Sequence, residues 1–309
     1  MQLLGLHHVT AIASDARRNV AFYTNVLGLR LIKKTVNFDD PSTYHLYYGD
    51  RVGTPGSVLT FFPWDGIRRG RPGTGQVYAT AFSVGAGALP FWEQRLRDNG
   101  VAFSPATRRF GDAVLAFADP DGLILELVAT AAPDPRSPWA NPEIPQTHGI
   151  RGFHNVTLAL AEPTRTHALL TTAMGYRVAA TEGQRTRLTI GDGAPGPFVD
   201  VLTDSSLPRG VQSGGTVHHV AFRAPDDAAQ AVALDEVRAL GLYASPVMDR
   251  KYFHSIYYRE PEGILFEIAT DTPGFAIDEP VESLGTRLML QPHYEAQRAE
   301  IEAHLQKLD

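Results

Sequence analysis

Four residues occupy matching positions in a chain that repeats one pattern, and their types suit a metal site. His8 and His219 each lie in an apolar, strand-like run, Glu267 lies in the last such run, and Thr60 takes the position equivalent to Glu267 in the first quarter of the chain. Two imidazoles and one carboxylate, with a small neutral side chain in the fourth place, leave coordination positions open. This set favours a non-haem Fe(II) oxygenase over a closed structural zinc site.

The elements that must position these residues recur four times along the chain. Each copy begins with a strand-like run and continues with a segment of helical period, which ends at a glycine that can adopt a left-handed cap. The runs are residues 6–13, 77–84, 153–160 and 217–224, and the glycines are Gly28, Gly100, Gly175 and Gly241. Two or three further strand-like runs follow each glycine, so the repeated unit is βαβββ.

The spacing within the copies is steady, and it decides which copies can form the site. From the first-strand positions His8, Ala79, Asn155 and His219 to the last-strand positions Thr60, Glu126, Asp200 and Glu267, the intervals are 52, 47, 45 and 48 residues. Only copies one and four together supply two histidines and one carboxylate. We therefore expect module one to pack beside module four. Modules two and three would pair without a metal, with Glu126 and Asp200 hydrogen-bonded or solvated.

The modules lie near residues 5–64, 75–130, 151–204 and 215–271. Five prolines within residues 131–150 disfavour a helix and predict a linker there. The linker divides the chain into a first half, residues 1–130, and a second half, residues 151–273. A C-terminal tail, residues 274–309, is predicted to contain a helix around 292–305.

Composition narrows the range of partners and chemistries. Lys and Arg total 28 against 34 Asp and Glu, a net charge of −6, and no basic run suits nucleic acid or an anionic membrane. The absence of cysteine excludes disulfides, a thiolate nucleophile and Cys-bound zinc. With no leader-like start and no long apolar run, we expect a cytoplasmic protein. Residues 191–196 match G-x-G-x-x-G, but a strand-like run follows, so a nicotinamide cofactor is not expected.

Other residues carry weaker signals. His45, His148, His167, His254 and His293 are interpreted as structural or exposed, with His254 kept as a candidate pocket residue because it shares a strand run with Tyr257. The aromatic run at residues 61–64 either lines a pocket or packs under a loop.

Several short motifs together resemble the vicinal oxygen chelate superfamily, which includes glyoxalase I, extradiol dioxygenases and antibiotic-resistance proteins. They are LHHVT at 6–10, YHLYY at 44–48, GTPG at 53–56, RGFH at 151–154, VHH at 217–219, YFHSIY at 252–257 and FE at 266–267. Within the superfamily the chain is similar to ring-cleaving dioxygenases of the hydroquinone type. The resemblance implies an α+β fold in which four βαβββ modules form two cupped mixed sheets.

The resemblance also implies Fe(II) bound by His8, His219 and Glu267, with Mn(II), Zn(II) or Ni(II) as alternatives. It implies further contacts from His7, Thr10, His218 and Tyr257, with Tyr257 as a proton donor and His218 or His7 as an acid or base. In a regular strand, however, His7 and His218 should point away from the metal. Only a local distortion or a network behind the metal reconciles the two expectations.

The expected reaction is O₂-dependent cleavage of a hydroquinone- or catechol-type aromatic diol. One departure concerns an arginine-containing insertion of the hydroquinone-cleaving relatives, which is missing after Lys251, so Arg250 or Lys251 would have to supply the cation. The alternatives are a glyoxalase-like metal-dependent isomerase or thiol transferase, and a metal-free small-molecule-binding resistance protein. Superfamily members often self-associate, so a homodimer is expected.

Overall fold

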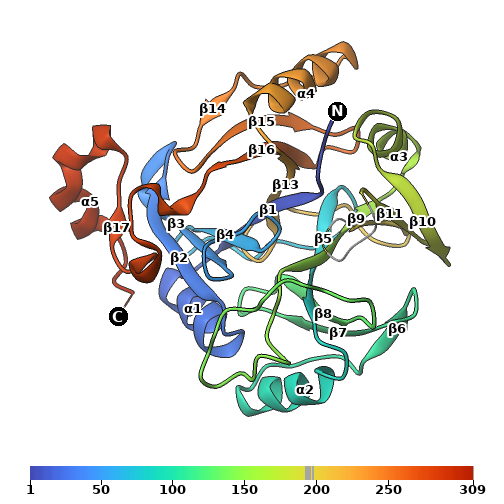
Figure 1. Cartoon of the computed structure of the whole chain (residues 1–309), viewed down its shortest axis with the longest axis horizontal. Coiled ribbons are helices and arrows are strands. Elements are labelled where there is room, and N and C mark those ends of the chain that lie inside the picture. Colours follow the sequence, from blue (N-terminus) through green and yellow to red (C-terminus); the bar gives the residue numbers. More distant parts are fainter. Residues whose placement is uncertain (192–195, 197, 309) are drawn as a thin grey trace.

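The computed structural model describes residues 1–191, 196 and 198–308, and it consists mainly of two large mixed sheets (Figure 1). Most of the G-x-G-x-x-G segment at residues 191–196 therefore lies outside the described residues. The first sheet has the order β14-β15-β16-β13-β1-β4-β3-β2-β17, and the second has the order β10-β11-β12-β9-β5-β8-β7-β6. Module one thus pairs with module four, and module two with module three, as the repeat positions predict.

Each module contributes one helical segment and at least three strands. Module one contains β1 (Leu6–Ala13), α1 (Ala16–Ala21) with a π-helical turn (Phe22–Val26), β2 (Arg30–Asn37), β3 (Asp40–Gly49) and β4 (Val58–Pro63). Module two contains β5 (Gln76–Val84), α2 (Leu89–Asp98), β6 (Thr107–Arg109), β7 (Asp112–Ala118) and β8 (Ile124–Ala129). The glycines that end the four helical segments all have positive φ, between 66° and 78°.

The second half of the chain repeats this plan. Module three contains β9 (Phe153–Leu160), α3 (Thr164–Ala168) with a π-helical turn (Leu169–Ala173), β10 (Arg177–Glu182), β11 (Arg185–Thr189) and β12 (Phe198–Thr203). Module four contains β13 (Val217–Ala224), α4 (Asp227–Ala239), β14 (Met248–Asp249), β15 (Phe253–Arg259) and β16 (Leu265–Pro273). Residues 131–150 form no helix or strand and connect β8 to β9.

The tail crosses the outer edge of the first sheet. It contains 3₁₀ turns (Phe275–Ile277 and Val281–Ser283), β17 (Leu288–Met289), a third 3₁₀ turn (Pro292–Gln297) and α5 (Arg298–His304). The helix predicted around 292–305 is therefore a 3₁₀ turn followed by a short α-helix. β17 pairs with β2, which places the tail beside module one (Figure 1).

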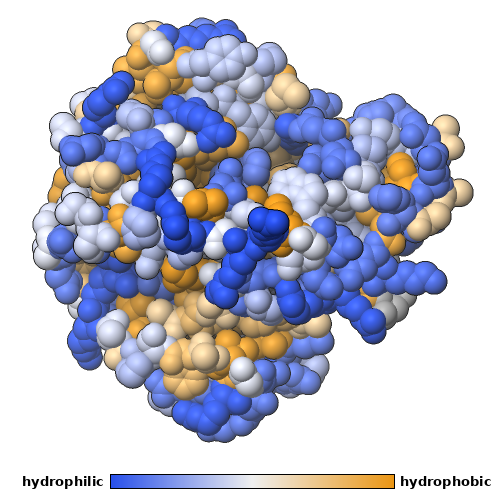
Figure 2. Space-filling model, turned by 180° about the vertical axis from the view of Figure 1, so that it is seen from behind, coloured by the Kyte–Doolittle hydropathy of each residue, from blue (hydrophilic) through white to orange (hydrophobic). Residues whose placement is uncertain are grey.

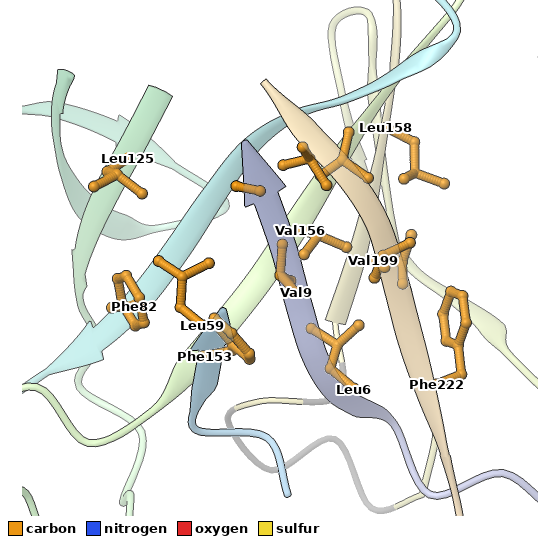
Figure 3. Close-up of a cluster of buried hydrophobic side chains, with 14 of the residues drawn as sticks. Leu6, Val9, Leu59, Phe82, Leu125, Phe153, Val156, Leu158, Val199 and Phe222 are labelled. Carbon is orange, nitrogen blue, oxygen red and sulfur yellow. The ribbon is translucent and has the colours of Figure 1, made fainter. Parts of the chain in front are cut away.

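Side-chain alternation separates a shared core from the concave face of the first sheet. Val9, Leu59 and Phe222 point from the first sheet into the same apolar cluster as Phe82 and Val156 from the second (Figure 3). The intervening residues of the first sheet, including His8, point away from this core. On the outer surface of the molecule, seen from behind in Figure 2, polar side chains cover most of the view, and apolar side chains gather toward its lower part.

A β-bulge interrupts the alternation in each first strand. The pairing of β1 with β13 shifts by one residue at His7 and again at His218, and the pairing of β5 with β9 shifts at Tyr78 and His154. A bulge adds one residue that turns a side chain to the other face of the strand. His7 and His218 therefore lie on the same side as His8 and His219, because the bulges supply the local distortion that was one of the two explanations open at the level of the sequence.

No helix among the described residues has the length and apolar character needed to cross a membrane.

Candidate metal centre

His8, His219 and Glu267 converge at the middle of the first sheet, from strands β1, β13 and β16. His8 Nε2 lies 3.3 Å from His219 Nε2 and 3.2 Å from Glu267 Oε2, and His219 Nε2 lies 2.9 Å from the same carboxylate oxygen. All three residues are buried. In the described part of the chain, they form the one group of three His, Asp or Glu side chains whose ligand atoms all lie within 4.8 Å of one another.

These separations fit one shared ion. Ligand atoms at adjacent corners of an octahedron lie about 3.0 Å apart when metal–ligand bonds are about 2.1 Å long. Glu267 Oε1 accepts a hydrogen bond from Ser255, whereas among the described residues the buried Oε2 faces only the Nε2 atoms of His8 and His219, and it has no donor when both nitrogens present lone pairs. A buried carboxylate oxygen without a donor is costly unless a cation completes the site. The donor set therefore fits a two-histidine, one-carboxylate triad with open positions.

The partner of His7 fixes which nitrogen of His8 can bind the ion. His7 Nε2 lies 3.1 Å from the Thr270 carbonyl, which can only accept, so this nitrogen carries the proton. His7 Nδ1 must then accept from His8 Nδ1, 2.9 Å away. Since His8 carries its proton on Nδ1, its Nε2 lone pair faces His219 and Glu267. His7 thus supplies the second-nitrogen partner that metal-bound histidines usually have.

His218 and His219 repeat this arrangement with one difference. Their Nδ1 atoms lie 2.7 Å apart, so a metal on His219 Nε2 would make His219 Nδ1 the donor and His218 Nδ1 the acceptor. The remaining proton of His218 then sits on Nε2, for which the described residues provide no partner. His218 lines the adjoining pocket, whereas His7 is held against a backbone carbonyl.

Burial favours the neutral forms of His7, His218 and His219, whereas Glu267 is ionised. Burial lowers the pKa values of His7 and His218 to about 3, helped by the neighbouring histidines. Burial also lowers the pKa of His219. For Glu267, burial alone raises the pKa, but the adjacent imidazoles outweigh it and hold the pKa well below its ordinary value. A neutral His219 and an ionised Glu267 are in the protonation states that a metal ion requires of its ligands.

A cavity of about 230 Å³ opens beside the triad and is lined by His8 and His219. Its walls are largely aromatic, and they include Phe38, Tyr47, Phe62, Trp64, Phe253 and Tyr257. The volume is below the range typical of drug-sized ligands, so the cavity suits a single substituted ring. Phe62 and Trp64 thus line a pocket, whereas Phe61 of the same run belongs to the core.

Tyr257 and Arg250 supply the polar groups at one side of this cavity. The Tyr257 ring packs edge-on against His219, 5.8 Å away, and Arg250 Nε donates to the Tyr257 hydroxyl at 3.2 Å. Burial raises the pKa of Tyr257 well above its ordinary value, so its hydroxyl stays protonated and can donate. Of the two candidate cations, Arg250 lines the pocket, whereas Lys251 is not among its lining residues.

Thr10 lies behind this pocket, in a buried chain of hydrogen bonds. Thr10 Oγ1 contacts Thr60 Oγ1 at 2.8 Å, Thr60 Oγ1 contacts His45 Nε2 at 2.8 Å, and His45 Nδ1 contacts the Tyr47 hydroxyl at 2.7 Å. His45 is a buried wall residue of the pocket, so its assignment as structural or exposed missed a site residue. Its alternation with Tyr47 on β3, beside Thr60 on β4, was the available signal.

His254 does not belong to the pocket. It lies on β15 with its Nδ1 2.6 Å from Asp227 of α4, and it faces a different surface depression. The expectation that it is a pocket residue is therefore wrong. His254 precedes Ser255 on the strand, and alternation turns it away from the side chains of Ser255 and Tyr257.

The matching positions of the second sheet hold ion pairs. Arg109 binds Glu126 at 2.7 and 2.9 Å, and Arg187 binds Asp200 at 2.8 and 3.0 Å. His154 repeats the neighbour contact, with its Nδ1 2.7 Å from Asn155 Oδ1. The two carboxylates are thus buried and paired with guanidinium groups, and in this sheet arginines supply the positive charge.

Comparisons with known proteins agree with this geometry. Residues 5–127 match the family model described as Glyoxalase/Bleomycin resistance protein/Dioxygenase superfamily. MhqO of Bacillus subtilis (strain 168), whose name assigns it to the ring-cleaving dioxygenases, is 44% identical over 98% of this chain and 96% of its own. The chlorohydroquinone/hydroquinone 1,2-dioxygenase of Sphingobium indicum is 34% identical over 96% of this chain and 94% of its own. The chain belongs to this superfamily, among its ring-cleaving dioxygenases.

Two solved structures share the fold of this chain. A crystal structure of a protein from Bacillus subtilis subsp. subtilis str. 168, described as a dioxygenase, superposes with a TM-score of 0.95 at 43% identity, covering 100% of this chain and 98% of that one. Glyoxalase I from Zea mays superposes with a TM-score of 0.66 at 15% identity, over 87% of this chain and 92% of that one, and so shares the fold.

Proposed function

We propose that this protein is a non-haem Fe(II)-dependent dioxygenase that uses O₂ to cleave the ring of a hydroquinone- or catechol-type diol. The observation that carries the proposal is the buried triad of His8, His219 and Glu267 at the base of an aromatic-walled cavity. These three residues would hold a metal ion with coordination positions left open, as in non-haem Fe(II) oxygenases. The names of the ring-cleaving relatives support the same reaction class.

The metal, when bound by these three ligands, would acidify a coordinated phenol and supply the redox chemistry that O₂ requires. The protein's own part is to orient the ring and to stabilise charge. The aromatic walls hold a planar substrate, and the protonated Tyr257 hydroxyl donates toward oxygen atoms in the pocket. Because Arg250 Nε donates to Tyr257, the tyrosine proton remains free for that purpose.

The two outer histidines divide their roles in this proposal. His7 is locked between His8 and the Thr270 carbonyl, so it orients a ligand and does not reach substrate. His218 presents Nε2–H to the pocket and acts as a neutral hydrogen-bond donor to negative charge that develops on the substrate. Arg250 supports a hydroquinone-type substrate, since it provides a cation on the pocket wall without the family insertion.

The fourth ligand position argues against the isomerase alternative. Thr60 stands where a four-ligand site would need a carboxylate, and its hydroxyl is engaged by Thr10 and His45. Those two hydrogen bonds account for the hydroxyl without a metal contact.

The test is reconstitution of the protein with Fe(II) under argon, followed by O₂ uptake with hydroquinone, catechol and their substituted forms. We expect uptake by the wild type, and loss of uptake in the His8→Ala and Glu267→Gln variants. His254→Ala, outside the pocket, serves as the matched control and should retain activity. No uptake across the whole panel, or full activity in Glu267→Gln, would contradict the proposal.

A further inference from the structure

A strained turn between β14 and β15 delivers two side chains to the pocket. Arg250 and Phe253 both line the cavity, and Lys251 lies between them with φ of 65°. The Tyr252 amide donates to the Arg250 carbonyl at 2.7 Å, and the Arg250 amide donates to the Phe253 carbonyl at 2.9 Å. A three-residue turn with positive φ at a non-glycine centre is rare, so its surroundings must hold it in place.

The C-terminal tail supplies that support. Lys251 Nζ lies 2.6 Å from Asp278 Oδ2 and donates to the Leu290 carbonyl at 3.1 Å. The Tyr252 hydroxyl donates to the same Asp278 oxygen at 3.1 Å. Both residues that separate Arg250 from Phe253 are therefore bound to the tail.

Asp278 is itself anchored in a buried ionic cluster. Lys33 of β2 has a fully buried side chain, and its Nζ lies 2.7 Å from Asp278 Oδ1 and 2.6 Å from Glu279 Oε2. Breaking a buried charge network is expensive because it leaves a charge without a partner. The tail is thus fixed to the first sheet at the point where it binds the turn.

The tail also contacts the opposite side of the pocket mouth. The Tyr294 hydroxyl donates to the Phe38 carbonyl at 3.3 Å, and Phe38 and Asp39 line the cavity. Asp39 in turn pairs with Arg250 at 3.2 Å across the mouth. The tail therefore contacts two parts of the pocket mouth: the turn that carries Arg250, and the Phe38–Asp39 segment with which Arg250 pairs.

We propose that the C-terminal tail is a brace that positions Arg250 toward the bound aromatic diol, with Lys251 and Asp278 as its positioning residues. The inference rests on the proposed function for the identity of the ligand. It assigns substrate affinity to a segment whose described residues, 274–308, neither belong to the triad nor line the cavity.

Lys251→Gly is the most direct test, since glycine adopts positive φ without strain and so removes the anchor while permitting the turn. Lys251→Arg retains the positive charge of the anchor, and Asp278→Asn removes the negative charge of its partner. Glu282→Gln is the matched control, because it removes an exposed tail carboxylate that pairs with Arg51 at 3.8 Å, away from the turn. Binding is measured under argon as quenching of tryptophan fluorescence by hydroquinone, to which Trp64 in the pocket wall responds.

We expect Lys251→Gly and Asp278→Asn to raise Kd and KM about tenfold, with kcat within about twofold of wild type and unchanged bound iron. Amide hydrogen exchange in a peptide spanning residues 249–254 should be faster in both variants. Lys251→Arg should recover much of the affinity, and Glu282→Gln should match wild type. Wild-type affinity and exchange in Lys251→Gly would overturn the brace.

The two proposals fail in different ways. If hydroquinone and catechol neither quench the wild-type fluorescence nor support O₂ uptake, the proposed function is wrong. The exchange measurement uses no substrate, so it still decides whether the tail holds the turn. Unchanged exchange in both Lys251→Gly and Asp278→Asn would overturn the brace even in an active dioxygenase.

Discussion

Replacement of His7 by phenylalanine should weaken metal binding although His7 is not a ligand. His7 Nδ1 accepts from His8 Nδ1 at 2.9 Å, and both residues are buried. A phenylalanine of similar shape would leave the His8 Nδ1–H without an acceptor whenever Nε2 binds the ion. Without a metal, His8 can move its proton to Nε2 and donate to Glu267 Oε2, 3.2 Å away, so the penalty falls on the metal-bound state.

The size of the effect follows from the cost of leaving the His8 Nδ1–H unpaired in the metal-bound state. An unsatisfied buried donor costs about 1–3 kcal/mol, and each 1.4 kcal/mol corresponds to about tenfold in affinity. We therefore expect Fe(II) affinity to fall about 10- to 100-fold, the range seen when outer partners of metal-bound histidines are removed. The assay is anaerobic competition with a chelator of known affinity. His7→Asn restores an acceptor of the kind that Asn155 offers to His154, and should recover most of the loss. Wild-type affinity in His7→Phe would refute the hydrogen-bond assignment.

Two further predictions concern stability away from the metal. Arg187→Met should destabilise the fold by about 3–5 kcal/mol, because it strips the main partner from buried Asp200, while Arg187→Met with Asp200→Leu should recover much of the loss. Urea unfolding measures both variants, and an unchanged midpoint in Arg187→Met would show that the ion pair contributes little. Burial raises the pKa of Asp119 to about 6, from an ordinary value of 3.8. The stabilising contribution of this group is complete below pH 3.8 and is lost as the pH rises through 6, a cost of up to about 3 kcal/mol at neutral pH. Asp119→Asn should therefore flatten the change in unfolding free energy between pH 4 and 6, and an unaltered pH profile would contradict this assignment.

The sequence by itself determined the module pairing and the candidate ligand set. His8, His219 and Glu267 share matching positions in modules one and four, and only that pairing assembles two imidazoles and one carboxylate. Repeat spacing and the alternation of a strand depend on local chain geometry, so both can be read without coordinates. Tyr257 and Thr10 were named by the family resemblance alone; Tyr257 lines the cavity, and Thr10 lies behind it.

Only the tertiary structure decided how the surrounding residues act. The bulges at His7 and His218 depend on the pairing of β1 with β13, and no local pattern announces a one-residue shift between strands. The choice of Arg250 over Lys251 depends on a turn held by the distant Asp278 of the tail. His45 lines the pocket and His254 does not, because the neighbouring strands determine which face of each strand lies against the cavity. Contacts between segments far apart in the chain set these outcomes, and spacing along one strand does not encode them.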